Sequence, residues 1–315
     1  MYTKQLGKRL LQTVLVALGI SFLTFFITYL APGDPVRTMF AAAGTMPDEE
    51  LIQETRAAMG LNRPVLVQYA GWLCGCLKGD FGISYAYHKP VAALLMDRLW
   101  PTLKLSVFSM FLMLLVSVPT GMIQATHKNS LADHVLRGLT FFGVSMPNFW
   151  VGLLLMLVFC VRLPLFPVAS FGGDFKSLVL PSVTLAFAMS AKYTRQVRTA
   201  ILEELSQDYV IGARARGIKE WKILWLHVFP NALLPLVTLL GLSLGSLLGG
   251  TAVVEVIFSY PGMGSLAVAA ITAYDYPLIQ GYVLWISLIY MLINLAVDAS
   301  YSLADPRMRQ KGQRI

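Results

Sequence analysis

The sequence is poor in charge. Of its 315 residues, only 13% are charged while 56% are hydrophobic, and the mean hydropathy is +0.64. Soluble proteins carry about 25% charged residues, so this composition excludes an ordinary soluble globular domain. Lipid is therefore the expected solvent for much of the surface.

The sequence also lacks the common motifs of enzyme sites. It has no Gly-rich loop ending in Gly-Lys-Ser/Thr, no Gly-x-Ser-x-Gly elbow and no His-Glu-x-x-His zinc site. The four histidines are His88, His127, His134 and His227. Their expected positions, in loops on opposite sides of a membrane, exclude a shared metal site, and the three cysteines are typical of apolar filler. We expect no catalytic residue, no metal site and no cofactor bound by this chain.

Long apolar runs are what the sequence does have. About 20 apolar residues are needed to cross a hydrocarbon core of about 30 Å. Five such runs are Leu10–Leu30, Pro101–Ile123, Leu139–Val161, Ala232–Ile257 and Leu278–Tyr301, and a shorter sixth is Leu178–Tyr193. The sequence therefore predicts an all-α integral membrane protein with about six transmembrane helices.

Basic residues are unevenly distributed between the loops. If both termini are cytoplasmic, most of the 25 Lys and Arg residues fall on the cytoplasmic side, as the positive-inside rule requires. The first run follows a basic start but no small-residue cleavage site comes after it, so we expect an uncleaved first helix. The net charge of +8 then reflects topology and not nucleic-acid binding.

The predicted organisation has four parts. Residues 1–30 form the cytoplasmic N-terminus and first transmembrane helix, 31–99 an extracytoplasmic segment, 100–303 the remaining transmembrane domain and 304–315 a cytoplasmic tail. In the extracytoplasmic segment, Thr45 and Asp48 have the spacing of a capping box before a helix that stops at Gly60, and a second helix is predicted from Pro64 to Lys78. We expect this segment to be folded.

A second polar segment, residues 195–230, is predicted to be cytoplasmic. Charged and apolar residues alternate there at helical spacing, which predicts two short amphipathic helices broken at Gly217. Two interpretations are open: the helices lie on lipid headgroups, or they dock on a partner protein.

Polar and kinking residues within or beside the apolar runs are candidates for a pathway or gate, because such groups are costly in lipid. The candidates are Ser145 and Asn148 in the third run, Glu255 near the outer end of the fifth, and Pro261, Gly262 and Gly264 in the turn that follows. Glu255 has two open roles, an interhelical hydrogen bond or a gate. A proton-coupled carrier is expected to place carboxylates or histidines near the midplane, and this pattern is missing. This absence favours a subunit that is powered by another polypeptide. A self-contained secondary carrier or channel is the alternative.

One cytoplasmic stretch carries a family resemblance. It reads Asp-Tyr-Val-Ile-Gly-Ala-Arg-Ala-Arg-Gly over residues 208–217 and His-Val-Phe-Pro-Asn-Ala-Leu-Leu-Pro over 227–235. This resembles the signature of permease subunits of bacterial ABC importers, in which Glu-Ala-Ala, three residues and Gly precede an apolar stretch ending in Pro. Gly217 and Pro230 match, whereas Ile211 and Gly212 stand at the Glu and first Ala positions, so a contact made by that Glu is not transferred.

Other phrases resemble the dipeptide, oligopeptide and nickel branch of that family, and the resemblance covers nearly the whole chain. They are Pro32-Gly33-Asp34-Pro35, Gly60-Leu61-Asn62-Arg63-Pro64, Gly79-Asp80-Phe81-Gly82, Pro261-Gly262-Met263-Gly264 and Asp305-Pro306-Arg307. The stretches 143–150 and 81–91 look slightly closer to nickel permeases than to oligopeptide permeases.

The resemblance implies a multi-pass subunit of the bacterial inner membrane that forms half of a pathway for peptides or nickel and works by alternating access. It implies a heterodimer with a homologous second permease, two cytoplasmic ATPase subunits that bind ATP and Mg, and an extracytoplasmic substrate-binding protein. The chain itself is then not an enzyme. The residues that match the coupling segment of the family are Tyr209, Ala213, Arg214, Gly217 and Pro230.

Overall fold

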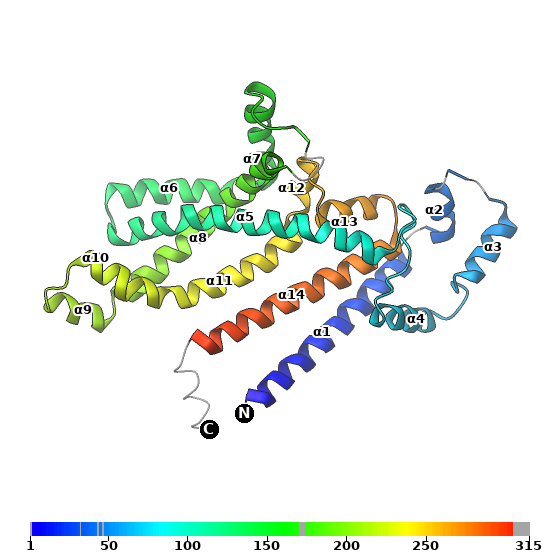
Figure 1. Ribbon diagram of the computed structural model, residues 1–315, viewed down its shortest axis with the longest axis horizontal. Coiled ribbons are helices and arrows are strands. Elements are labelled where there is room, and N and C mark those ends of the chain that lie inside the picture. Colours follow the sequence, from blue (N-terminus) through cyan, green and yellow to red (C-terminus); the bar gives the residue numbers. More distant parts are fainter. Residues whose placement is uncertain (1, 32, 43, 46, 170–173, 305–315) are drawn as a thin grey trace. The chain divides into compact units, whose positions relative to one another are not determined.

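The computed structural model describes residues 2–31, 33–42, 44–45, 47–169 and 174–304 (Figure 1). Within these residues the secondary structure is helical, with one isolated bridge between Ile83 and Pro90. The predicted all-α class is confirmed. The chain divides into a first unit, Met1–Thr102 with Pro261–Met291, and a second unit, Leu103–Tyr260 with Leu292–Ile315.

The first unit is built around the 31–99 segment. Its helices are α1 (Tyr2–Leu30), α2 (Pro35–Ala42), α3 (Glu49–Ala58), α4 (Val65–Leu77), α13 (Met263–Thr272) and the first parts of α5 (Val91–Thr126) and α14 (Tyr276–Ala304). Phe81, Leu95, Met263 and Leu278 lie in its apolar core. Short helices occupy parts of the predicted extracytoplasmic segment, whereas residues 91–99 belong to α5, and we call residues 34–90 the α2–α4 segment.

Local chemistry explains where these short helices begin and end. The N-cap of α3 is Asp48, whose Oδ1 accepts a hydrogen bond from the Leu51 N–H at 2.9 Å. The predicted capping role of Thr45 is therefore wrong, because its hydroxyl bonds to the Phe40 carbonyl instead. Helix α3 stops before Gly60, which has φ +69°, a conformation that glycine adopts without strain.

Aromatic side chains attach α4 to α1. The Tyr69 ring lies against Phe22 and Phe25 with centroids 5.4 and 5.5 Å apart, and the Tyr69 hydroxyl is 2.8 Å from Ser21 Oγ. Trp72 packs on Phe25 as well. One face of α4 is thereby held on the last turns of α1.

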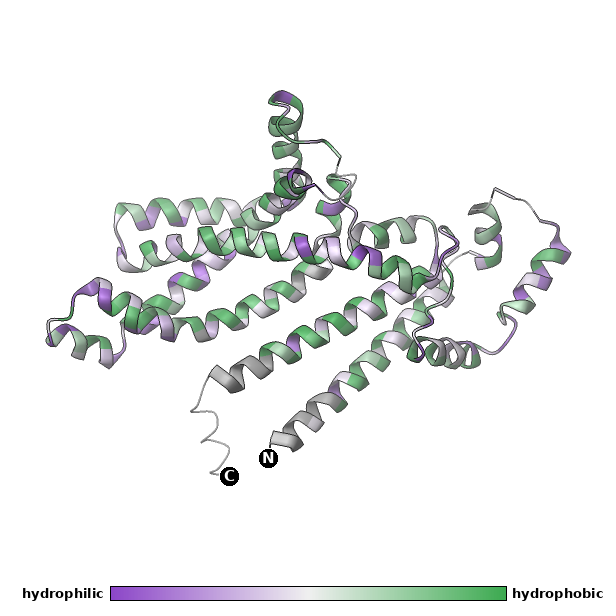
Figure 2. Cartoon of the chain, viewed as in Figure 1, coloured by the Kyte–Doolittle hydropathy of each residue, from purple (hydrophilic) through white to green (hydrophobic). Residues whose placement is uncertain are grey.

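The second unit centres on α8. Its helices are α6 (Leu131–Ser145), α7 (Asn148–Met156), η1 (Leu157–Arg162), α8 (Phe175–Leu205), α9 (Asp208–Ala215), α10 (Glu220–Ile223), η2 (Leu224–Val228), α11 (Phe229–Gly250), α12 (Ala252–Ile257) and the later parts of α5 and α14. Helix α8 packs against α6, α7, α11 and α12 and buries Tyr193, Val197 and Ile201. Hydrophobic residues dominate α1, α5, α11 and α14, while hydrophilic residues gather on α3 and around α9 (Figure 2).

Among the residues that the structure describes, three helical stretches are long and apolar enough to cross a membrane: Leu11–Leu30, Val91–Thr126 and Tyr276–Val297. The number rises to five if each of two bent helix pairs counts as one span. The predicted number of six spans remains a prediction.

Two of the predicted runs are interrupted. The run Leu139–Val161 was expected to be one span, but α6 ends at Ser145, α7 begins at Asn148, and the pair is bent by 96°. Pro147 has no N–H and disfavours helical geometry at Met146, which has ψ 129°. The run Ala232–Ile257 is likewise divided at Thr251, between α11 and α12.

Candidate functional sites

The α9–α10 segment, residues 208–228, has one buried side. Val210 and Ala213 of α9 are buried together with Ile223 of α10 and Val228, in the same apolar cluster as the α8 residues. Helices α9 and α10 lie on either side of Gly217, while the first part of the predicted polar segment, up to Leu205, belongs to α8. Since Ala213 points into this cluster, it supports the segment from inside and is not part of its outer surface.

Gly217 forms the break between α9 and α10. It has φ +72°, its N–H donates to the Arg214 carbonyl at 2.9 Å, and the next N–H donates to the Ala213 carbonyl at 3.2 Å. A Cβ added at Gly217 would meet no atom within 4 Å. The position therefore requires glycine for its left-handed backbone and not for space.

The other side of the segment exposes apolar and aromatic side chains. Ile211 is 58% exposed, Trp221 58% and Trp225 52%. Arg214 and Glu220 form an ion pair across the Gly217 turn, with Nε and Oε1 2.7 Å apart. Large apolar patches with a polar rim mark surfaces that bind a partner or a membrane.

The polar groups on this surface have fixed protonation. The hydrogen bond to Glu220 raises the pKa of Arg214. Burial, aided by the Glu204 carboxylate, raises the pKa of Tyr209, whose hydroxyl donates to Glu204 Oε2 at 2.6 Å. Near neutral pH the surface therefore carries a cationic Arg214 and a neutral Tyr209. Pro230, the fifth predicted coupling residue, is exposed in the first turn of α11, where a missing N–H costs little.

A buried carboxylate near the start of α6 was not predicted. Asp133 is fully buried and accepts hydrogen bonds from Arg137 Nη2 at 2.6 Å, from Arg198 Nη2 at 3.1 Å and from the Asn129 N–H at 3.0 Å. It ties α6 to α8. The Ser130-x-x-Asp133 spacing, a capping signal, could have located the helix start, but the partner Arg198 is 65 residues away.

Ser145 and Asn148 lie on either side of the bend at Pro147. Both are exposed, and the Ser145 hydroxyl donates to the Phe141 carbonyl at 2.9 Å. Their role in a pathway remains a prediction. What the structure shows is that the bend places them on two helices and not on one continuous span.

Glu255 is fully buried in α12. Its Oε1 accepts a hydrogen bond from Thr251 Oγ1 at 2.8 Å, within one helical turn. Pro261, Gly262 and Gly264 belong to the first unit, where Gly262 is the N-cap of α13. Neither role that the sequence left open for Glu255, a hydrogen bond to another helix or a gate, is decided by the Thr251 contact.

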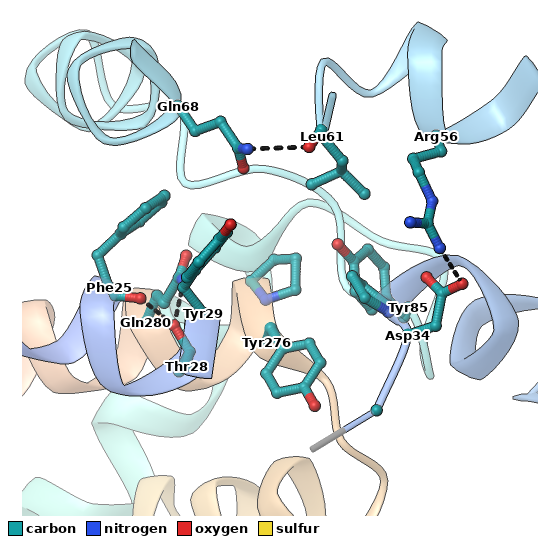
Figure 3. Close-up of a pocket in the computed structure, with 13 residues that line it drawn as sticks. Phe25, Thr28, Tyr29, Asp34, Arg56, Leu61, Gln68, Tyr85, Tyr276 and Gln280 are labelled. Atoms are coloured by element: carbon teal, nitrogen blue, oxygen red, sulfur yellow. Dashed lines mark hydrogen bonds and ion pairs between the residues drawn. The ribbon is translucent and has the colours of Figure 1, made fainter. Parts of the chain in front are cut away.

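The first unit also contains a cavity that the sequence did not predict. It has a volume of about 420 Å³ and is shown in Figure 3. It is lined from α1 by Phe25, Thr28 and Tyr29, from the turn into α2 by Gly33, Asp34 and Pro35, from α3, the α3–α4 turn and α4 by Arg56, Leu61 and Gln68, and from the remainder by Tyr85, Tyr276, Pro277 and Gln280. Burial raises the pKa of Tyr85, and the Asp275 carboxylate adds to the effect, so Tyr85 presents a neutral hydroxyl. The walls combine aromatic rings with amide, carboxylate and guanidinium groups.

The family models and the named relatives match nearly the whole chain. Residues 117–310 match the family described as binding-protein-dependent transport system inner membrane component, and residues 2–106 match the N-terminal region of such membrane components. The chain is 35% identical to the probable D,D-dipeptide transport system permease protein DdpB of Escherichia coli (strain K12), over 95% of each chain. It is 37% identical to the glutathione transport system permease protein GsiC of the same strain, over 96% of this chain and 98% of that one. A solved structure of the MetNI methionine ABC transporter in an inward-facing conformation matches 67% of this chain and 96% of its own chain, with a TM-score of 0.58 and 17% identity, which supports the fold.

Proposed function

Because this chain belongs to the family of binding-protein-dependent transport system inner membrane components, we propose that it passes short peptides through the membrane and receives its driving force through the α9–α10 segment. The chain is a permease subunit of an ABC importer of the peptide branch, in the inner membrane, and not the self-contained carrier that the sequence left as an alternative.

Short peptides are the cargo that the relatives favour. The D,D-dipeptide and glutathione permeases both align with this chain over nearly its full length. The nickel alternative, to which two sequence stretches gave a slight preference, gains no support from these relatives. We therefore assign a peptide of two or three residues as the substrate class.

The α9–α10 segment is the proposed contact with an ATPase subunit. The observation that carries this assignment is its two-sided structure: Val210 and Ala213 are buried against α8, while Trp221 and Trp225 are exposed. A push on the exposed side would therefore be transmitted to α8 and α11 through packed side chains. We propose on this basis that the segment and both termini lie in the cytoplasm, and that a homologous second permease and an external binding protein are partners.

Two substitutions at Gly217 test the assignment. Valine does not tolerate φ +72°, whereas asparagine, of similar size, is among the residues that do. Both side chains would enter open space. Gly217→Val should reduce ATP-dependent uptake of a labelled dipeptide at least tenfold at equal membrane level, and Gly217→Asn should retain most of it.

The partners are tested on the same membranes. Pull-down of the tagged chain in mild detergent should recover a Walker-motif ATPase and a second multi-span permease, and Gly217→Val should lose the ATPase but keep the permease. Normal uptake by both variants would show that the segment does not couple. Equal loss in both would show that side-chain size, and not the left-handed turn, limits the contact.

A further inference from the structure

An ion-pair chain ends at the wall of the first unit's cavity. Glu49 binds Arg37, with 2.6 Å between Oε2 and Nη2, and Arg37 Nε lies 3.7 Å from Asp34 Oδ2, which also binds Arg56. The Arg56 guanidinium is the last member, and its Nε is buried without a partner among the described residues. Figure 3 shows Arg56 and Asp34 side by side at one end of the cavity. The Arg56 side chain is nevertheless 35% exposed and lines the cavity, and the exposed N–H groups of a guanidinium are suited to a carboxylate.

Two glutamines offer hydrogen-bond acceptors. Gln68 Nε2 donates to the Leu61 and Arg63 carbonyls at 3.0 and 2.8 Å, and since a carbonyl only accepts, the Gln68 amide has one orientation. Gln280 Nε2 lies 2.5 Å from Thr28 Oγ1, whose own proton goes to a backbone carbonyl, so that amide is fixed as well. Both Oε1 atoms remain available, because neither accepts a hydrogen bond from a described residue, and both residues line the cavity.

The size and walls of the cavity limit its occupant. A volume of about 420 Å³ lies within the range of about 300 to 1,000 Å³ that small-molecule sites occupy. The rings of Phe25, Tyr29, Tyr85 and Tyr276 supply apolar walls. The occupant should therefore be small, carry one carboxylate, donate N–H groups and have a partly apolar body.

We propose that the cavity bounded by Arg56, Gln68 and Gln280 is a binding site for the carboxyl end of a short peptide. The carboxylate pairs with Arg56, and peptide N–H groups donate to the two glutamine oxygens. A lipid phosphate would also pair with Arg56, but a phosphodiester has no amide N–H to donate. The proposal rests on the proposed function for its substrate class and adds to it a peptide site in the α2–α4 segment.

Binding is tested with the full chain in phosphatidylcholine nanodiscs, by calorimetric titration with three probes. Trialanine should bind, trialanine with an amidated C-terminus should bind at least tenfold more weakly, and N-acetyl-trialanine should bind within about threefold of trialanine because the oxygens need N–H groups and no cation. Equal binding of the acid and the amide would overturn the proposal.

Matched variants connect binding to the cavity. Arg56→Gln removes the cation, and Arg63→Gln removes an exposed guanidinium of the same segment. Arg56→Gln also breaks the pair with Asp34, so a second variant is needed. Leu61→Trp fills the cavity and leaves the ion pairs intact. Its control is Leu51→Trp, which adds the same ring at an exposed position of α3. Arg56→Gln and Leu61→Trp should each weaken trialanine binding at least tenfold, and the two controls should leave it unchanged.

Two further outcomes separate the alternatives. If phosphatidylglycerol added to the discs displaces trialanine from the unmodified chain, the site holds a lipid headgroup and the peptide proposal is wrong. A second outcome is that Arg56→Gln and Leu61→Trp both bind trialanine as the unmodified chain does, and that the importer with Leu61→Trp takes up trialanine at the normal rate. The cavity would then not be a peptide site, although the proposed transport function would stand. Failure of the unmodified importer to take up any short peptide would instead contradict the proposed function.

Discussion

The α2–α4 segment and the α9–α10 segment are both polar insertions in an apolar chain, yet they differ in whether buried polar groups help to hold them. The first combines the aromatic packing of Tyr69 and Trp72 on α1 with buried side-chain hydrogen bonds: Asp275 is fully buried and accepts from the Ser84 hydroxyl at 2.5 Å and from the Ala86 N–H at 3.1 Å. The second is fixed by apolar burial of Val210, Ala213 and Ile223. Directional bonds hold a cavity in one shape, whereas an apolar face below an exposed aromatic surface suits contact with another protein.

The comparison predicts that one carboxylate supports the first unit. Asp275→Ala leaves the Ser84 hydroxyl and the N–H groups of Ala86 and Leu278 without their acceptor. The free energy of unfolding of the first unit should fall by about 3 kcal/mol or more, because each unsatisfied buried donor costs about 1 to 3 kcal/mol. Limited proteolysis should cut the α2–α4 segment while ATPase recovery in the pull-down remains normal. The control is Asp80→Ala, which removes an exposed carboxylate from the stretch between α4 and Ser84. Loss of ATPase recovery in Asp275→Ala would show that the two segments are not independent.

A second prediction tests whether the second unit has a polar anchor of its own. Asp133→Ala removes the common partner of Arg137 and Arg198. Loss of one side of a fully buried pair costs about 3 to 5 kcal/mol, and the partial exposure of both arginines lowers our expectation to about 2 to 3 kcal/mol. The melting temperature of the purified chain should fall, whereas Asp208→Ala, at an exposed acid in α9, should leave it unchanged. An unchanged melting temperature in Asp133→Ala would leave apolar burial as the dominant stabilising term of that unit.

The same contrast explains which features could be predicted from the sequence. Helix ends at Gly60 and Gly217 depend on local backbone preferences, and both are as predicted. The predicted cap at Thr45 was wrong because the neighbouring Asp48 takes that role. The kinking residues noted at 145–148 correspond to a bend of 96° at Pro147 within the predicted span. The Asp275–Ser84 bond joins residues 191 apart, and the cavity needs four separate stretches of chain. Such pairings depend on tertiary structure, so no local pattern indicates them.

A third prediction concerns the buried side of the α9–α10 segment. Val210→Ala removes two buried methyl groups, at about 2 kcal/mol including the cavity left behind. The neighbouring Ile211→Ala removes exposed apolar surface and should change stability by less than about 0.5 kcal/mol. Val210→Ala should therefore lower the melting temperature, and Ile211→Ala should instead weaken ATPase recovery in the pull-down. A stability loss in Ile211→Ala equal to that in Val210→Ala would contradict the two-sided structure.

The smallest expected effect is at the ion pair across the Gly217 turn. Arg214 and Glu220 are 46% and 66% exposed, so Arg214→Gln should change stability by less than about 1 kcal/mol, as other exposed pairs do. If the pair only stiffens the turn, exchanging the two residues, Arg214→Glu with Glu220→Arg, should restore uptake, since attraction across the turn is regained. If Arg214 also contacts the ATPase, the exchanged pair should restore stability but not uptake, because the positive charge has moved to the other side of the turn. A double-mutant cycle on melting temperature and uptake separates these two roles of Arg214. An interaction free energy between Arg214 and Glu220 above about 2 kcal/mol would show that this surface, like the α2–α4 segment, depends on directional polar bonds.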